Sequence, residues 1–175
     1  STDVNKIQSG RLDVDIQNEA GKSISNLEWF AKDGRAQSEI FWEPGCTYTL
    51  TPFKIVNTGN LALKYKLVVT GLDGDSELLD VIKFTYNVGE EMFDISKEGH
   101  LAPNGGSTGM ITVSAHMDEA AGNKYMEKEL NGVKITVYAT QDTVESDSFD
   151  NQYDKNATYF APATVGNNDD LKSAL

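Results

Sequence analysis

The side chains that could perform chemistry are few and scattered along the chain. His100 lies in a glycine-rich stretch, and His116 lies on the more polar face of a strand-like run. Neither belongs to a His-Glu-x-x-His motif, and no Gly-x-Ser-x-Gly turn accompanies them; these motifs would indicate a zinc protease or an α/β-hydrolase. We therefore expect both histidines at the surface, and we predict no catalytic residue, no cofactor and no enzyme activity.

Acidic residues could bind calcium at two places. Residues 73–77 read Asp-Gly-Asp-Ser-Glu, but glycine is the second residue, whereas an EF-hand loop needs it at the sixth. Asp147, Asp150 and Asp154 form a second group in a generally acidic stretch. The single cysteine, Cys46, excludes an intramolecular disulfide and a cysteine-based zinc site. We interpret both acidic groups as solvated and predict no metal ligand.

Length and charge narrow the class of protein. The chain has 175 residues, about one domain, with 27 acidic and 15 basic residues and a net charge of −12. Nucleic acids and anionic membrane surfaces need a basic footprint, so the acidic balance argues against both as partners. No apolar run reaches the length of a membrane span. The sequence therefore indicates a single domain without nucleic-acid or membrane-spanning function.

Alternating apolar and polar residues predict strands along most of the chain. The clearest runs are residues 11–16, 47–56, 61–70, 110–117 and 133–139. About seven short strands without regular helices between them favour a mostly β fold, an antiparallel sandwich with one or more short helices and long loops.

Three local features add detail to this fold. The turn Asn57-Thr58-Gly59-Asn60 predicts a hairpin between the second and third runs. Residues 118–129 are the one convincing helix, with Asp118 as its N-cap. The aromatic side chains expected in the core or at its rim are Trp29, Phe30, Phe41 and Trp42.

Composition divides the chain into three parts. Residues 1–10 are an N-terminal segment, residues 11–141 form the sandwich domain, and residues 142–175 form an acidic tail with seven acids against two lysines. We interpret the tail as extended. It contains an apolar island that could cover a sheet edge, in the same subunit or in a neighbour. The island residues are Tyr159, Phe160 and Pro162.

Several blocks resemble one family of secreted proteins. Residues 9–14 are similar to the start of mature proteins that carry SipW-type signal peptides, and residues 53–66, after Pro44-Gly45, are similar to a conserved hairpin of that family. Three later blocks match in the same order, at residues 117–125, 137–141 and 147–154. The chain thus resembles the TasA/camelysin family over residues 9–154, and the tail from residue 155 lies beyond the family pattern.

The resemblance implies a jelly-roll-like sandwich, secretion after cleavage upstream of Ser1, and assembly into extracellular filaments of a biofilm matrix or surface pilus. In the family's fibre-forming members, an N-terminal segment leaves its own subunit and completes a sheet of the next. Here the donor would be residues 1–10, with Val4 and Ile7 as apolar plugs. Their three-residue spacing needs a bulge, because side chains alternate along a strand. The implied partner is a second copy of the chain, head to tail, together with further matrix components.

Two other functions, and an N-terminal segment without a function, are also compatible with the sequence. Some family members have been described as metalloproteases, although no metal motif is present here. A monomeric extracellular binding module would use exposed aromatics such as Trp29 and Trp42. The N-terminal segment could also be a frayed end. Because subunits of charge −12 repel each other, we expect salt, divalent cations or low pH to favour any self-assembly.

Overall fold

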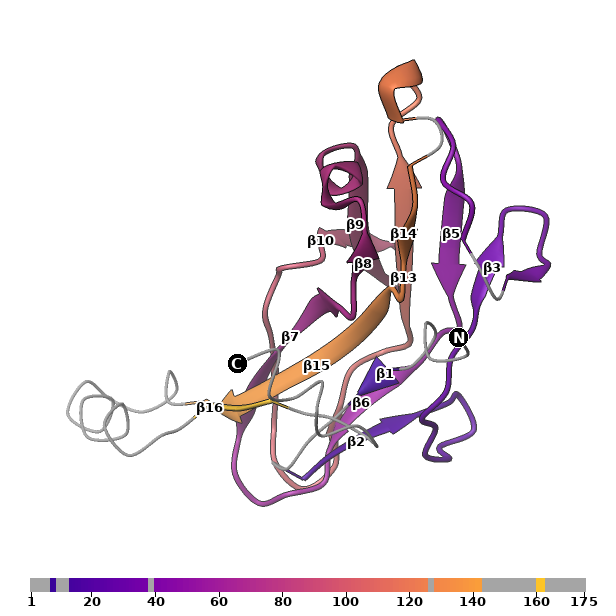
Figure 1. Ribbon diagram of the computed structural model, residues 1–175. Coiled ribbons are helices and arrows are strands. Elements are labelled where there is room, and N and C mark those ends of the chain that lie inside the picture. The colour runs from indigo at the N-terminus through magenta and orange to yellow at the C-terminus, as the bar shows by residue number, and fades with distance from the viewer. Residues whose placement is uncertain (1–6, 9–12, 38–39, 126–127, 143–159, 163–175) are drawn as a thin grey trace.

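The computed structural model describes residues 7–8, 13–37, 40–125, 128–142 and 160–162, and these form a mostly β structure (Figure 1). In chain order the elements are β1 Ile7–Gln8, β2 Val14–Gln17, β3 Trp29–Ala31, β4 Ala36–Gln37, β5 Thr47–Leu50, β6 Lys54–Asn57, β7 Leu63–Thr70, β8 Asp73–Gly74, the 3-10 helix η2 Ser76–Asp80, β9 Ile82–Val88, β10 Glu91–Asp94, β11 Gly99–Leu101, β12 Gly106–Ser107, β13 Ile111–Met117, the 3-10 helix η3 Asn123–Tyr125, β14 Leu130–Asn131, β15 Lys134–Gln141 and β16 Phe160–Pro162.

Two larger sheets carry most of these strands. One has the order β1-β15-β7-β11, with β16 also paired to β15; the other has the order β10-β9-β13-β5-β3-β4. Two small sheets, β12-β6-β2 and β14-β8, complete the structure. Every pairing among these strands is antiparallel except that of β1 with β15. The predicted mostly β, antiparallel sandwich class is confirmed.

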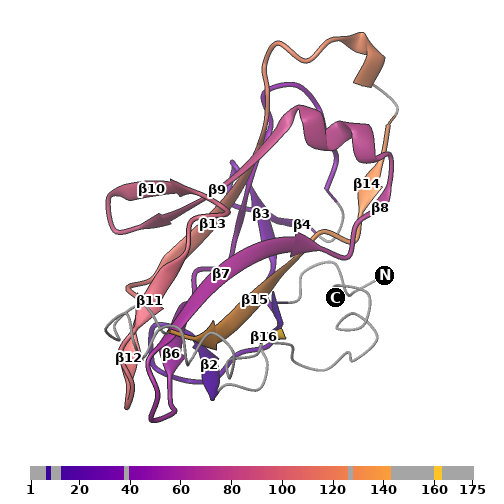
Figure 2. The same cartoon turned by 90° about the vertical axis from the view of Figure 1, so that its left-hand side faces the viewer.

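Alternation along the strands explains how the core forms. In β13 the side chains of Ile111, Val113, Ala115 and Met117 are all buried, while the residues between them are partly exposed. The same period of two buries alternate residues of β7 and β9. Because successive side chains point to opposite faces, each strand contributes one apolar face to a common core. Figure 2 shows β7 and β15 running side by side, as their pairing requires.

Two tryptophan side chains are buried in the core, and each donates a hydrogen bond to a backbone carbonyl oxygen. Trp29 is fully buried, and its Nε1 donates to the carbonyl oxygen of Val133 at 3.4 Å. Trp42 is 9% exposed, and its Nε1 donates to the carbonyl oxygen of Leu130 at 3.1 Å. Their expected place in the core or at its rim is confirmed. Phe41 is different, because its side chain is 67% exposed, so that part of the prediction is wrong.

The predicted hairpin on either side of residues 57–60 is wrong. Strand β6 pairs with β2 and β12, whereas β7 pairs with β15 and β11. The polar turn therefore carries the chain from one sheet to another. Asn57, which is fully buried, stabilises this crossing: its side-chain amide donates to the carbonyl oxygen of Leu61 at 2.8 Å.

The predicted helix over residues 118–129 is also wrong. Within its described part only Asn123–Tyr125 is helical, as one turn of 3-10 helix. The other helix, Ser76–Asp80, is of the same kind. A short segment that contains a glycine, here Gly122, gains too little from local hydrogen bonds to form an α-helix on its own. No helix in the described part of the chain is long and apolar enough to cross a bilayer.

Candidate functional site: the outer edge of strand β15

Strand β15 pairs with a short strand from near each end of the chain, in addition to β7. One edge pairs with β7 along all eight residues, from Lys134 opposite Thr70 to Gln141 opposite Leu63. The other edge pairs with β1 in parallel, Ile7 opposite Ile135 and Gln8 opposite Thr136. It also pairs with the antiparallel β16. We call this second edge, from Ile135 to Thr140, the outer edge of β15.

The register divides the outer edge between the two terminal strands. Tyr138, Ala139 and Thr140 lie opposite Pro162, Ala161 and Phe160, respectively. Strand β1 lies opposite the two residues Ile135 and Thr136. Only Val137 separates the two paired stretches. The outer edge therefore offers about 20 Å of strand, at roughly 3.3 Å per residue, and both chain ends use it.

The apolar composition of β15 would favour pairing with other chains if the outer edge were unpaired. Ile135, Val137 and Ala139 are buried on the core face, and Thr136 and Tyr138 on the opposite face are also buried. A long apolar strand with unpaired N–H and C=O groups is a template for pairing with another chain. A strand laid along this edge satisfies those groups, whether it comes from the same chain or from another copy.

The sequence-predicted site residues fall as follows. Ile7 is in β1 and lies opposite Ile135, on the outer edge. Phe160 and Pro162 are in β16, on the same edge. Val4 and Tyr159 lie outside the described residues. The sequence predicted the strand at residues 133–139 but gave no sign that its edge would receive both chain ends.

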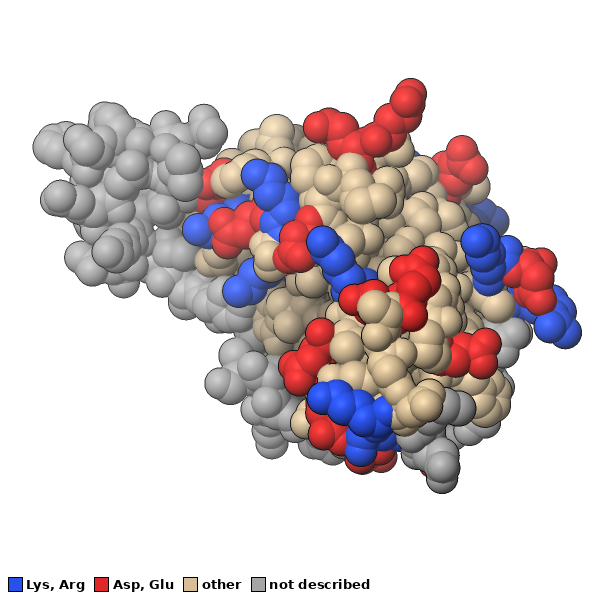
Figure 3. Space-filling model, turned by 90° about the horizontal axis from the view of Figure 1, so that it is seen from above, with Lys and Arg blue, Asp and Glu red and all other residues tan. Residues whose placement is uncertain are grey.

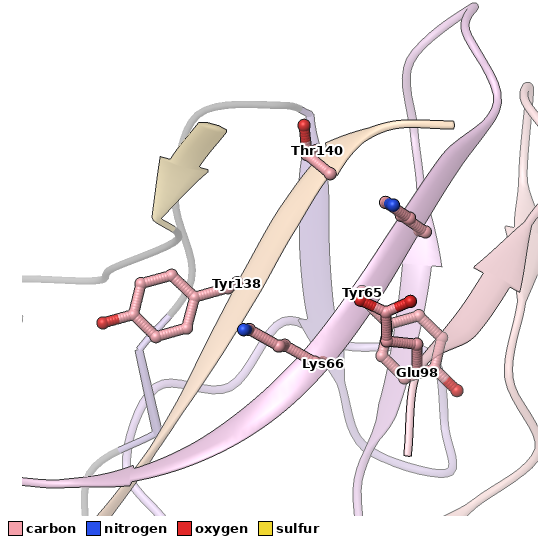
Figure 4. Close-up of a pocket in the computed structure, with 6 residues that line it drawn as sticks. Tyr65, Lys66, Glu98, Tyr138 and Thr140 are labelled. Carbon is pink, nitrogen blue, oxygen red and sulfur yellow. The ribbon is translucent and has the colours of Figure 1, made fainter. Parts of the chain in front are cut away.

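Two lysines lie on β7, across β15 from the outer edge. Lys66 is opposite Tyr138 and Lys64 is opposite Thr140 in the β7/β15 register. With Tyr65 and Glu98, these side chains line a cavity of about 210 Å³ (Figure 4). On another face, Figure 3 shows acidic and basic side chains interspersed.

A histidine–carboxylate pair holds the chain where it leaves β15. The side chain of Asp142 is 2% exposed, and its Oδ2 lies 2.8 Å from Nδ1 of His100. The backbone N–H of Asp142 donates to the carbonyl oxygen of Ala62 at 2.9 Å. The first residue of the acidic tail is therefore fixed against β11 and the start of β7.

The second histidine belongs to a surface network on the other large sheet. Nδ1 of His116 lies 2.7 Å from Oγ1 of Thr47, and its Nε2 lies 3.2 Å from Oε1 of Glu119. Thr47 and His116 are directly opposite each other in the β5/β13 register, so cross-strand packing accounts for the contact. The hydrogen bond from His116 also lowers the pKa of Glu119. Both histidines are partly exposed, with side-chain exposures of 52% for His100 and 38% for His116.

In the part of the chain that the structure describes, the other candidate groups form no recognisable reaction centre. Among the described residues, no three His, Cys, Asp or Glu side chains are placed to hold a metal ion. Burial raises the pKa of the Cys46 thiol, which disfavours the reactive thiolate. Trp29 and Trp42 are buried, so a binding module that uses them as an exposed platform is excluded.

Comparison with known proteins gives this chain no relative: no family model, no curated protein and no solved structure matches it.

Proposed function

We propose that the protein is a secreted structural subunit that assembles into extracellular filaments, in a biofilm matrix or a surface pilus. Residues 1–10 of one copy pair with the outer edge of β15 in the next. The observation that carries the proposal is the pairing of β1 with β15, in which Ile7 lies opposite Ile135. The resemblance of residues 9–154 to the TasA/camelysin family supports the same function.

The change from a contact within one chain to a contact between chains needs no new surface. A terminal segment that pairs with an edge in its own subunit can make the same backbone contacts in another copy, as in domain swapping. Only five residues separate Gln8 from Val14, the first residue of β2. A short connection of this kind favours exchange when the closed form is strained.

The geometry of the contact predicts a filament. The donor is an N-terminal segment and the acceptor is a strand edge, so the two surfaces of the interface are different. Such a heterologous contact repeats from copy to copy and extends into a filament unless it closes into a ring. The partner is therefore a second copy of this chain, head to tail, with other matrix components as further partners.

Deletion of residues 1–10 tests this function directly. We expect the full chain to form filaments in negative-stain electron microscopy at high salt, and the deleted chain to stay monomeric by light scattering. Ile7→Pro removes one backbone N–H from β1 and should reduce assembly, while Ile7→Val, which suits a strand, serves as the matched control. Filaments of normal yield from the deleted chain would refute the proposal.

A further inference from the structure

The five-stranded sheet turns one face to the core and carries a polar cavity on the other. Leu63, Tyr65 and Leu67 of β7 are buried in the core. Because side chains alternate along a strand, Lys64 and Lys66 lie on the opposite face, where both are partly buried. We call this second face of the sheet its polar face.

Strand register surrounds the two lysines with polar side chains. Across β15, Lys64 lies opposite Thr140 and Lys66 lies opposite Tyr138. The β11/β7 register, continued by one residue before β11, places Glu98 on the other side of Lys66. Figure 4 shows Lys66 pointing from β7 toward Tyr138 on β15. All five residues line the cavity of about 210 Å³.

The two lysines form a local excess of positive charge in an acidic chain. Neither Lys64 nor Lys66 forms an ion pair with another residue in the described part of the chain, whereas Lys128 pairs with Glu77. Two residues apart on a strand, their Cα atoms are separated by about 7 Å. Their flexible stems allow both ammonium groups to reach one anion, which would offset their mutual repulsion.

The other lining groups indicate which kind of anion fits. The carboxylate of Glu98 repels a second negative charge, so it disfavours a doubly charged phosphate. As a hydrogen-bond acceptor, the same carboxylate suits a ligand with hydroxyl groups. The cavity is smaller than the roughly 300–1,000 Å³ of pockets for drug-sized ligands, so it holds one small unit. One carboxylate beside several hydroxyl groups is the chemistry of a uronic acid.

We propose that this cavity binds a uronic-acid unit of an acidic polysaccharide, with the carboxylate on Lys64 and Lys66 and the hydroxyl groups toward Glu98. The cavity lies within a single copy of the chain, so the inference goes beyond assembly and does not depend on it. If the chain forms filaments, each copy along the filament carries one such site.

Equilibrium dialysis of the full chain against a galacturonic acid trimer at low salt tests the site. Lys64→Gln with Lys66→Gln removes both charges and keeps most of each stem. Lys22→Gln with Lys83→Gln is the matched control, because it changes the net charge equally at two exposed lysines. We expect the first pair to weaken binding by at least about tenfold, since a charge-assisted hydrogen bond contributes roughly that factor, and the control pair by less than about twofold.

Two further probes test the kind of anion. A neutral galactose trimer lacks the carboxylate, and inorganic phosphate lacks the sugar hydroxyl groups. We expect both to bind more weakly than the galacturonic acid trimer. Glu98→Gln should narrow the difference between the trimer and phosphate, because it removes the charge that repels phosphate.

Chemical modification of the wild type locates the site without any variant. Acetylation of lysine amines, followed by mass spectrometry, reports how accessible each ammonium group is. We expect the galacturonic acid trimer to slow acetylation of Lys64 and Lys66 and to leave Lys22 and Lys83 unchanged. This readout does not depend on whether a variant folds or whether the chain has assembled.

The outcomes separate this inference from the proposed function. Equal affinities of the Lys64/Lys66 variant and its control, phosphate that binds as tightly as the galacturonic acid trimer, or unprotected Lys64 and Lys66 would each overturn the uronic-acid site. None of these results bears on filaments, so donor-strand assembly would still stand. Filaments from the chain that lacks residues 1–10 would refute assembly and leave the binding site unaffected.

Discussion

Replacement of Tyr65 by phenylalanine should change how the stability of the protein depends on alkaline pH. Tyr65 is a residue of β7, 6% exposed, and its hydroxyl is hydrogen-bonded to Tyr86 of β9 in the other large sheet. Tyr86 in turn donates to the carbonyl oxygen of Lys97 at 2.8 Å. Burial, together with the hydrogen bond to Tyr86, raises the pKa of Tyr65 from 10 to about 12. This chain of hydroxyls joins the sheet that holds the outer edge of β15 to the opposite sheet.

The raised pKa of Tyr65 determines the sign and size of the effect. Below pH 10 the phenol is neutral in both the folded and the unfolded chain, so its contribution to stability is fully present. Between pH 10 and 12 the unfolded chain loses this proton while the folded chain keeps it, and stability falls. A shift of two pKa units corresponds to about 2.7 kcal/mol in full, of which about 2.3 kcal/mol is lost by pH 12.

Urea unfolding of the wild type and Tyr65→Phe at pH 8, 10, 11 and 11.5 measures this contribution. At pH 8 we expect the variant to be less stable by about 1 kcal/mol, because it loses the hydrogen bond between Tyr65 and Tyr86. As the pH rises above 10, the wild type should lose stability faster than the variant, so that the two curves converge and then cross before pH 11.5. Curves that stay parallel from pH 8 to 11.5 would refute the reasoning.

Three further predictions concern packing, the tail anchor and assembly. Gly99→Ala should destabilise the fold by about 1–3 kcal/mol in urea unfolding, because a Cβ there would lie 2.3 Å from the Tyr65 ring; Gly122→Ala, with open space around it, should be nearly neutral. His100→Leu removes a hydrogen-bond partner of the buried Asp142 carboxylate, so it should lower the free energy of unfolding by about 1–3 kcal/mol in urea unfolding. His100→Gln should lower it less, and equal losses would contradict the hydrogen-bond argument. Filament yield should increase from low to high salt because the subunit carries a charge of −12, and a yield that is flat across salt would refute the electrostatic argument.

Local patterns in the sequence were sufficient to predict the strands, but not to predict which strands pair with each other. The alternation over residues 110–117 and 61–70 is visible in the sequence because each strand buries one face, and β13 and β7 formed there. The hairpin prediction failed because a polar turn between two strands is equally suited to a crossing between sheets. The pairing of β6 with β2 rather than β7 is a long-range choice that no short motif encodes.

The candidate site was also predictable only in part, because its residues lie in short segments whereas the strand that pairs with them is set by long-range topology. The resemblance to the TasA/camelysin family pointed to Ile7 as a donor residue, and the apolar island of the tail pointed to Phe160 and Pro162 as residues that could cover an edge. The strand that receives them could not be identified, because the place of β15 in its sheet, beside β7 and outside β11, depends on long-range pairing. A sequence pattern indicates that a strand exists, and only the topology indicates which edge it leaves open.

The other sheet edges in the described structure suggest why assembly would use β15. At one edge of the six-stranded sheet, β10 exposes Glu91 and Asp94 beside Met92, and charged residues of this kind oppose pairing with another strand. At the other edge β4 has two residues, and at the far edge of the five-stranded sheet β11 has three. These edges are short or charged, whereas β15 is long and apolar and is covered by short strands from the chain's own ends. Charged side chains oppose the pairing of any added strand, whereas under the proposed assembly an edge covered by a terminal strand accepts the same strand from another copy.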